Sequence, residues 1–196
     1  MTRIGILGGT FDPVHNMHLE LATQALVQYE LDTVLFVPAG LPVRKLYTTH
    51  ASAKERLHML ELACRDTAAF EVCSLEVDRP QITYTIDTLR ELKALYGEES
   101  RFFLILGEDA VRDLSTWKNS REIARLVCVL FARRIGSEGA LVLPEGFTCL
   151  ELQIPLDPVS STTIRRLLRE GEDVHSLVPA EVLSYIMEQG LYDESE

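Results

Sequence analysis

Residues 4–18 read Ile-Gly-Ile-Leu-Gly-Gly-Thr-Phe-Asp-Pro-Val-His-Asn-Met-His, and this stretch carries most of the information about the fold. Its first residues are apolar and β-prone, which predicts a short buried strand. Gly8 and Gly9 allow the backbone to turn sharply or to lie directly against a ligand. Pro13 disfavours helix at the residue before it and suits the entrance of a helix. We therefore expect a strand, a tight turn and the start of a helix.

Two histidines stand at the expected opening of this helix. His15 and His18 are three residues apart, so on a helix they share one face. The N-terminus of a helix offers free N–H groups, and Thr10 adds a hydroxyl group nearby. Hydroxyl, amide and imidazole groups together predict a phosphate-binding site at this junction.

Strand-like and helix-like segments alternate along the rest of the chain. Strands are expected over residues 2–7, 33–37, 70–77, 102–106, 127–132 and 148–153. Helices are expected over 15–30, after the capping box at 52–55, over 83–96, after Gly107, over 163–169, and between Pro179 and Gly190. Such alternation predicts a Rossmann-like, three-layer α/β/α fold with a mostly parallel central sheet. Ligands of these sheets bind beyond the carboxyl ends of the strands, where the strand order reverses.

Size and composition restrict the class of protein. The 196 residues, 46% of them hydrophobic, predict a single domain over 1–196 with a small helical portion from about residue 160. The formal charge of −11 disfavours nucleic acid as a partner. No run of 18 apolar residues is present, so we expect a soluble cytoplasmic protein without a membrane partner. The four cysteines lack zinc or disulfide spacing and are expected to be reduced thiols.

The motifs of the chain resemble those of a known superfamily. Gly9-Thr10-Phe11-Asp12, followed by His15 and His18, resembles the nucleotidyltransferase signature of Gly-Thr-Phe-Asp and His-x-Gly-His. Residues 38–45 and 84–89 are similar to segments of nicotinate-nucleotide adenylyltransferases, and Ser160-Ser161-Thr162-x-Ile164-Arg165 is similar to their carboxy-terminal signature. The resemblance covers nearly the whole chain.

This resemblance implies an activity: ATP and nicotinic acid mononucleotide give nicotinic acid adenine dinucleotide and pyrophosphate, by direct attack and without a covalent intermediate. The implied catalytic residues are His15, His18, Lys45 and Arg165. The implied ATP-binding residues are Gly8, Gly9, Thr10, Phe11, Gly107, Ser161, Thr162 and Ile164. The implied mononucleotide-binding residues are Thr10, Lys45, Thr85, Asp109 and Trp117. Mg²⁺ is the expected cofactor, held mainly by ATP phosphates and without a carboxylate cage; a homo-oligomer is possible.

Three positions depart from the family pattern. Met17 replaces the glycine between the histidines and is expected to crowd the nucleotide, Arg44 stands where histidine is usual, and Glu108 adds a negative charge near the phosphates. Two alternatives therefore stay open. One is another adenylyltransferase of the superfamily, with nicotinamide mononucleotide or phosphopantetheine as acceptor. The other is a nucleotide-binding module without catalysis. Acid and amide acceptors are not distinguished, because a backbone N–H near Thr85 could be the deciding group.

Overall fold

The computed structural model describes residues 1–41, 49–134, 141–156 and 159–193. The strands are β1 (Arg3–Gly9), β2 (Thr33–Pro38), β3 (Phe70–Val72), β4 (Arg101–Gly107), β5 (Val127–Arg134) and β6 (Cys149–Leu156). The helices are α1 (Asn16–Gln28), α2 (Ala53–Cys64), α3 (Thr85–Tyr96), α4 (Glu108–Asp113), the 3₁₀ turn η1 (Leu114–Thr116), α5 (Ser120–Leu126), α6 (Ser161–Arg169) and α7 (Ala180–Gln189).

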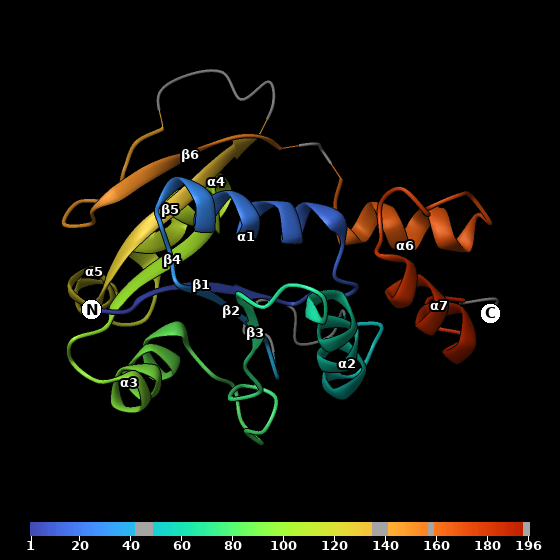
Figure 1. Cartoon of the computed structure of the whole chain (residues 1–196), viewed down its shortest axis with the longest axis horizontal. Helices are drawn as coiled ribbons and strands as arrows, with labels where there is room; N and C mark the ends of the chain where they lie inside the picture. Colours follow the sequence, from blue (N-terminus) through green and yellow to red (C-terminus); the bar gives the residue numbers. More distant parts are fainter. Residues whose placement is uncertain (42–48, 135–140, 157–158, 194–196) are drawn as a thin grey trace.

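The strands form one sheet in the order β3-β2-β1-β4-β5-β6, and all five neighbouring pairs are parallel (Figure 1). From β1 the chain first moves outward to β2 and β3, and it then returns to the other side of β1 for β4, β5 and β6. The strand order therefore reverses between β1 and β4. Because loops on the two sides of this point diverge, the carboxyl ends of β1 and β4 flank the natural ligand crevice.

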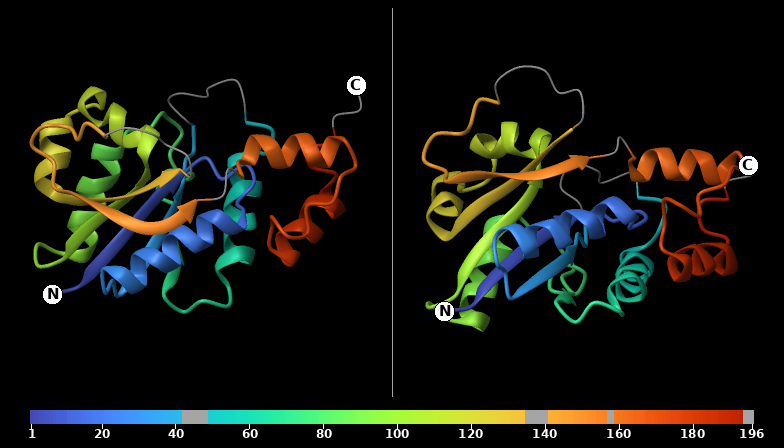
Figure 2. Two further views of the ribbon diagram at one scale, coloured as in Figure 1. Left: turned by 90° about the horizontal axis from the view of Figure 1, so that it is seen from above. Right: turned by 45° about the horizontal axis from the view of Figure 1, so that its top comes forward.

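Helices cover both faces of the sheet (Figure 2). Alternate strand residues enter two separate hydrophobic clusters, as the period of two along a strand requires. One cluster joins the sheet to α1, α2, α6 and α7, and includes Leu7, Ala22 and Met59. The other joins it to α3, α4 and α5, and includes Ile6, Leu89 and Ile123. The predicted three-layer fold is confirmed.

Two predictions about the elements were wrong. The strand expected over 70–77 ends at Val72, because the chain turns away where Asp78 N–H donates to the Ser74 carbonyl over 3.0 Å. Helix α5 was not expected, since its short run after Asn119 has only Ile123 buried. The capping box of α2 is confirmed: Glu55 N–H donates to Ser52 Oγ, and Ser52 N–H donates to Glu55 Oε2 over 2.6 Å.

The outer edge of β6 is covered by α1. The Gln28 side-chain amide donates to the Gln153 carbonyl over 3.0 Å and accepts from Gln153 N–H over 2.9 Å. Tyr29 Oη donates to the Glu151 carbonyl over 2.8 Å. These groups satisfy edge positions that another strand would otherwise pair with.

Gly40 follows β2 in the chain, and the packing around it leaves no room for a side chain. A Cβ atom built there would fall directly on the main-chain oxygen of Glu76, whereas one built on Gly8 would meet nothing within 4 Å. We predict that Gly40→Ala lowers the free energy of unfolding by about 2 kcal/mol or more through overpacking. Gly8→Ala is the matched control and should change it by less than about 0.5 kcal/mol. Urea unfolding measures both; equal stability of the two variants would contradict the packing.

Candidate active site

The turn after β1 brings the sheet to the opening of α1. Gly8 and Gly9 still belong to the strand, and the sharp bend falls at Phe11, whose φ is 51°. The expected bend at the glycine pair was therefore wrong. The Phe11 ring explains why this non-glycine residue is held there: it is 2% exposed and contacts the His18 ring edge-on, with centroids 4.9 Å apart.

His15 and His18 lie together, as their spacing predicts. Their rings are stacked with centroids 3.7 Å apart and an interplanar angle of 28°. His15 is the N-cap of α1, and its backbone N–H donates to His18 Nδ1 over 3.2 Å. Because Nδ1 of His18 accepts this bond, the neutral ring carries its proton on Nε2. His18 can therefore donate a hydrogen bond from Nε2 to a ligand oxygen.

Both imidazoles are held in the neutral form. Burial lowers the pKa of His15 to about 4. Burial also lowers the pKa of His18 well below its usual value, and the neighbouring His15 lowers it further. At neutral pH the pair therefore offers hydrogen bonds rather than two positive charges.

Two buried charged side chains hold the turn. Asp12 is 3% exposed and accepts from the N–H groups of His50 and Ala51 at 2.9 and 3.1 Å. Arg56 is 1% exposed and donates to the carbonyls of Thr10, Gly40 and Ala51 at 2.6, 3.1 and 3.3 Å. A guanidinium group has five donors in a fixed fork, so it can satisfy three carbonyls at once.

Sequence reasoning did not identify Arg56 as part of the site. The available signal was its position on α2: with Met59, Leu60 and Cys64 it occupies the buried face at helical spacing. A charged residue on an apolar helix face requires a buried partner. The missing information was which carbonyls it reaches, since two of the three, those of Thr10 and Gly40, belong to other segments of the sequence.

Helix α6 approaches the same turn. Arg165 Nη1 donates to the Asp12 carbonyl over 2.6 Å, and Ser161 Oγ donates to the Pro13 carbonyl over 2.9 Å. Thr162 is exposed beside Arg165, whereas Ile164 is fully buried in the core. Arg166 turns outward and pairs with Glu170. The structure thus brings Ser161, Thr162 and Arg165 to the turn, while the side chains of Ile164 and Phe11 serve the core.

Within the described ranges, two buried nitrogen atoms near the turn lack a hydrogen-bond partner. They are Nδ1 of His15 and Nε of Arg165. Buried polar atoms are normally paired, and an unpaired one calls for an explanation such as a ligand. An anion at the opening of α1 would supply acceptor oxygens to both residues.

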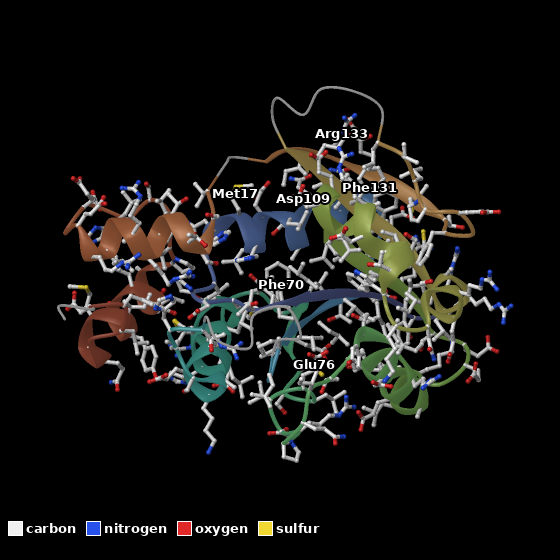
Figure 3. The ribbon with its side chains drawn as sticks, turned by 180° about the vertical axis from the view of Figure 1, so that it is seen from behind. Met17, Phe70, Glu76, Asp109, Phe131 and Arg133 are labelled. Carbon is white, nitrogen blue, oxygen red and sulfur yellow. The ribbon has the colours of Figure 1, made fainter. Side chains whose placement is uncertain are left out.

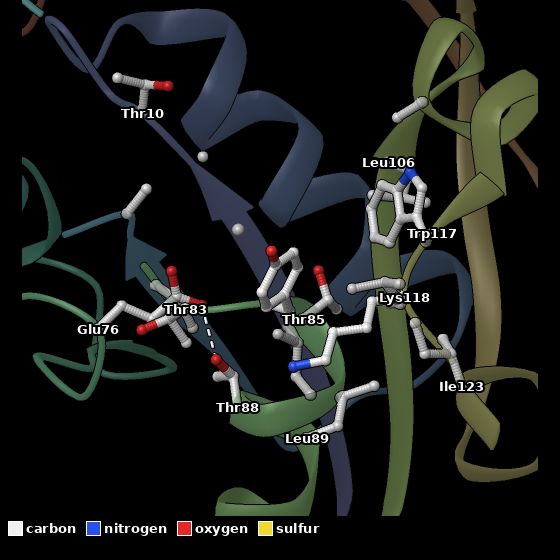
Figure 4. Close-up of a pocket in the computed structure, with 18 of the residues that line it drawn as sticks. Thr10, Glu76, Thr83, Thr85, Thr88, Leu89, Leu106, Trp117, Lys118 and Ile123 are labelled. Carbon is white, nitrogen blue, oxygen red and sulfur yellow. Dashed lines mark hydrogen bonds between the residues drawn. The ribbon is translucent and has the colours of Figure 1, made fainter. Parts of the chain in front are cut away.

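A cavity of about 520 Å³ lies on the other side of the sheet, between β1, β2, β4 and α3 (Figure 4). Thr10, Thr85 and Trp117, three of the predicted mononucleotide-binding residues, line it. Thr85 is the first residue of α3, where backbone N–H groups have no partner inside the helix. Lys118 also lines the cavity; its Nζ is 4.2 Å from the centre of the Tyr84 ring and 3.2 Å from Asp87 Oδ2.

The cavity also holds an acidic side chain that sequence reasoning missed. Thr88 Oγ1 donates to Glu76 Oε1 over 2.7 Å. The pKa of Glu76 is raised above its usual value, because the effect of burial is larger than the lowering by this hydrogen bond. Glu76 and Met17 lie on opposite sides of the sheet (Figure 3). The turn at Thr10 therefore stands between two compartments, the histidines on the α1 side and the cavity on the α3 side.

The remaining predicted residues lie in different places. Gly107 ends β4 and has open space around it, and Asp109 is exposed in the first turn of α4 outside the residues that line the cavity. Glu108 is 5% exposed, and its carboxylate lies 3.5 Å from Arg133 Nε, so its negative charge is compensated. Met17 is partly buried and packs against the core. Lys45 and Arg44 lie outside the described residues.

The described ranges contain neither a candidate metal cage nor a candidate membrane-spanning helix. No group of three or more His, Cys, Asp or Glu side chains there could hold a metal ion. The donors at the turn are imidazole, hydroxyl and guanidinium groups, which suit phosphate oxygens rather than Mg²⁺. All four cysteines are free, and no helix in these ranges is long and apolar enough to cross a membrane.

The sequence matches known proteins along nearly its whole length. A family model described as cytidylyltransferase-like matches residues 6–167. A relative from Thermoanaerobacter sp. is 38% identical and one from Exiguobacterium sibiricum is 42% identical; the matches cover 99% and 97% of this chain and 96% and 98% of the relatives. Both relatives are named "Probable nicotinate-nucleotide adenylyltransferase".

The chain belongs to the nicotinate-nucleotide adenylyltransferase family. The resemblance found in its motifs is thereby confirmed. A solved structure, the Plasmodium falciparum nicotinic acid mononucleotide adenylyltransferase complexed with NaAD, has the same fold: its TM-score is 0.81 at 20% identity, with 98% of each chain covered. The fold of this chain is thus similar to that of the Plasmodium falciparum protein, although the two sequences have diverged.

The buried neutral state of His15 makes stability depend on pH. Its pKa is about 4 in the folded protein and about 6.5 in an unfolded chain, so the unfolded chain binds the proton first as pH falls. Stability is therefore present above about pH 6.5 and is lost towards pH 4. We predict that between pH 7 and pH 5 the wild type loses about 2 kcal/mol more unfolding free energy than His15→Asn does. Urea unfolding at both pH values tests this; parallel losses would mean that His15 is not held neutral.

Proposed function

We propose that this protein transfers the adenylyl group of ATP to nicotinic acid mononucleotide, releasing pyrophosphate and forming nicotinic acid adenine dinucleotide, in NAD biosynthesis. The observation that carries the proposal is the stacked His15–His18 pair at the opening of α1, next to a cavity that contains Thr10, Thr85 and Trp117. Family membership supports the same reaction. As an ATP-using enzyme with free thiols, it would work in the cytoplasm.

The proposed reaction needs positioning and charge neutralisation more than covalent chemistry. An oxygen of the mononucleotide phosphate forms a bond to the α-phosphorus of ATP, and the bond from that phosphorus to the pyrophosphate oxygen breaks. Negative charge grows on the α-phosphate oxygens and on the leaving group. His18 Nε2–H and the first N–H groups of α1 are suited to bind the α-phosphate oxygens, because a donor that costs no reorganisation stabilises such charge.

The other phosphate groups would be bound by residues around the turn. We assign the β- and γ-phosphates to Arg165, Ser161 and Thr162 at the start of α6. The Thr10 hydroxyl would hold the incoming phosphate, and Lys45, proposed from the sequence alone, would add a positive charge. Gly8, Gly9 and Gly107 would let the nucleotide approach the backbone. Mg²⁺ is proposed to arrive on ATP, held mainly by phosphate oxygens, and would lower the charge of the leaving pyrophosphate.

The pyridine ring of the acceptor would occupy the 520 Å³ cavity. Trp117 offers a flat face for the ring, and the first N–H groups of α3 near Thr85 offer donors to its carboxylate. Asp109 is assigned to a ribose hydroxyl. Carboxylate recognition at a helix N-terminus favours the acid over the amide, because the helix dipole attracts a negative charge.

The proposal is tested by measuring pyrophosphate release with MgATP and each of three acceptors. We expect turnover with nicotinic acid mononucleotide, at least about tenfold above that with the amide or phosphopantetheine, since a full charge at a helix N-terminus is worth roughly 1–2 kcal/mol. Preference for the amide or phosphopantetheine would replace the proposed acceptor by that one. Release with none of the three would identify a nucleotide-binding module without catalysis.

His18 is expected to act mainly in the transition state. We predict that His18→Ala lowers kcat about 100-fold, the effect of losing one oxyanion donor, while the Kd for ATP changes less than about threefold. His58→Ala, an exposed histidine on α2, is the matched control and should leave both values unchanged. Equal losses in kcat and in ATP affinity would show that His18 binds the ground state instead.

A further inference from the structure

The turn between β1 and α1 is hydrogen-bonded to residues of the carboxy-terminal part of the chain. Besides the two bonds from α6 described above, Asn16 N–H donates to the Leu177 carbonyl and Asn16 Nδ2 donates to the Ser176 carbonyl, both over 2.9 Å. Tyr192 Oη donates to Asp12 Oδ1 over 2.9 Å, across 180 positions of sequence. His15 lies inside the stretch that these bonds hold. In Figure 1, α6 and α7 lie beyond the opening of α1, and α7 packs beside α2.

Tyr192 is placed as a buried hydrogen-bond donor. It follows α7 with a φ of 69° and is 6% exposed. Burial, and then the nearby Asp12 carboxylate, raise the pKa of the Tyr192 phenol far above its usual value, so it stays protonated and donates. The family model ends at residue 167, so this bond comes from outside the part of the chain that the model matches.

The hydrogen bond from Tyr192 affects the orientation of Asp12, because the Asp12 carboxylate accepts hydrogen bonds from separate segments of the chain. Its oxygens accept from His50, Ala51 and Tyr192, and Oδ2 also lies 3.9 Å from Arg165 Nη1. Among the residues that the structure describes, loss of the Tyr192 hydroxyl leaves Oδ1 with only the 3.1 Å bond from Ala51 N–H. The carboxylate is then freer to swing towards the Arg165 guanidinium, which the proposed reaction needs for phosphate.

We propose that Tyr192 is a positioning residue for adenylyl transfer, acting through Asp12 on the turn that carries His15 and on the orientation of Arg165. The carboxy-terminal segment then helps to position the residues that bind phosphate. This inference rests on the proposed function. It follows from the sensitivity of such reactions to geometry, since a displacement of about 1 Å can cost about 100-fold in rate.

The experiment compares Tyr192→Phe with wild type in pyrophosphate release and in thermal unfolding. The phenylalanine keeps the ring and removes only the hydroxyl. We expect kcat to fall about tenfold, matching the loss of one hydrogen bond to a charged group, with KM for ATP within about twofold. Tyr185→Phe, on α7 and facing His58 rather than the turn, is the matched control and should keep wild-type kcat.

A double-mutant cycle separates positioning from general stability. If Tyr192 acts through Asp12, Asp12→Ala, which removes the acceptor of the Tyr192 bond, combined with Tyr192→Phe should lower kcat no more than Asp12→Ala alone, whereas independent effects would multiply. Unchanged kcat in folded Tyr192→Phe, or multiplicative losses, would overturn the inference. Absence of turnover in the wild type would instead overturn the proposed function.

Asn16→Ala provides a second test if Tyr192→Phe does not fold. Asn16 is exposed, and the substitution removes only its side-chain bond to Ser176. Kcat should fall about threefold or more without a change in the unfolding temperature, because the bond holds the residue next to His15. Wild-type kcat in this variant would contradict a positioning role for the carboxy-terminal segment.

Discussion

Two buried charged side chains, Asp12 and Arg56, bind the main chain of neighbouring segments instead of solvent, and the geometry of the site depends on them. Asp12 accepts N–H groups from His50 and Ala51, while Arg56 donates to carbonyls of Thr10, Gly40 and Ala51. An irregular turn that is buried at the carboxyl end of an interior strand leaves polar backbone groups that must be paired. These two side chains pair them and thereby fix where β1 ends and α1 begins.

From this fixed turn the two compartments of the site follow. The sheet separates the face of α1 from the face of α3, and the turn at Thr10 touches both because it lies at the reversal of strand order between β1 and β4. A phosphate group bound at the turn can thus meet a ligand from either face. The stacked neutral imidazoles and the cavity are arranged so that the two proposed substrates would approach from opposite sides.

Two of the three departures from the family pattern, Glu108 and Met17, have a local physical account. Glu108 is compensated by Arg133, which removes much of the negative charge expected near phosphate. Met17 packs against the core, where a flexible thioether fills space. The residues of the Gly-Thr-Phe-Asp motif have different structural roles. The buried Phe11 ring packs against His18, and the Asp12 carboxylate accepts a hydrogen bond from Tyr192 in a distant segment.

The sequence by itself determined the alternation of strands and helices, the junction of β1 and α1, and the shared face of His15 and His18, because each depends on residues close together in the chain. Periodicity and caps are local signals, so they can be read without the fold. Only the tertiary structure decided the shortness of β3, the bend at Phe11 and the roles of Arg56, Glu76 and Tyr192. The roles of Arg56, Glu76 and Tyr192 each depend on a contact with another segment, such as the one between Tyr192 and Asp12, and no local pattern encodes which partner a buried polar group will meet.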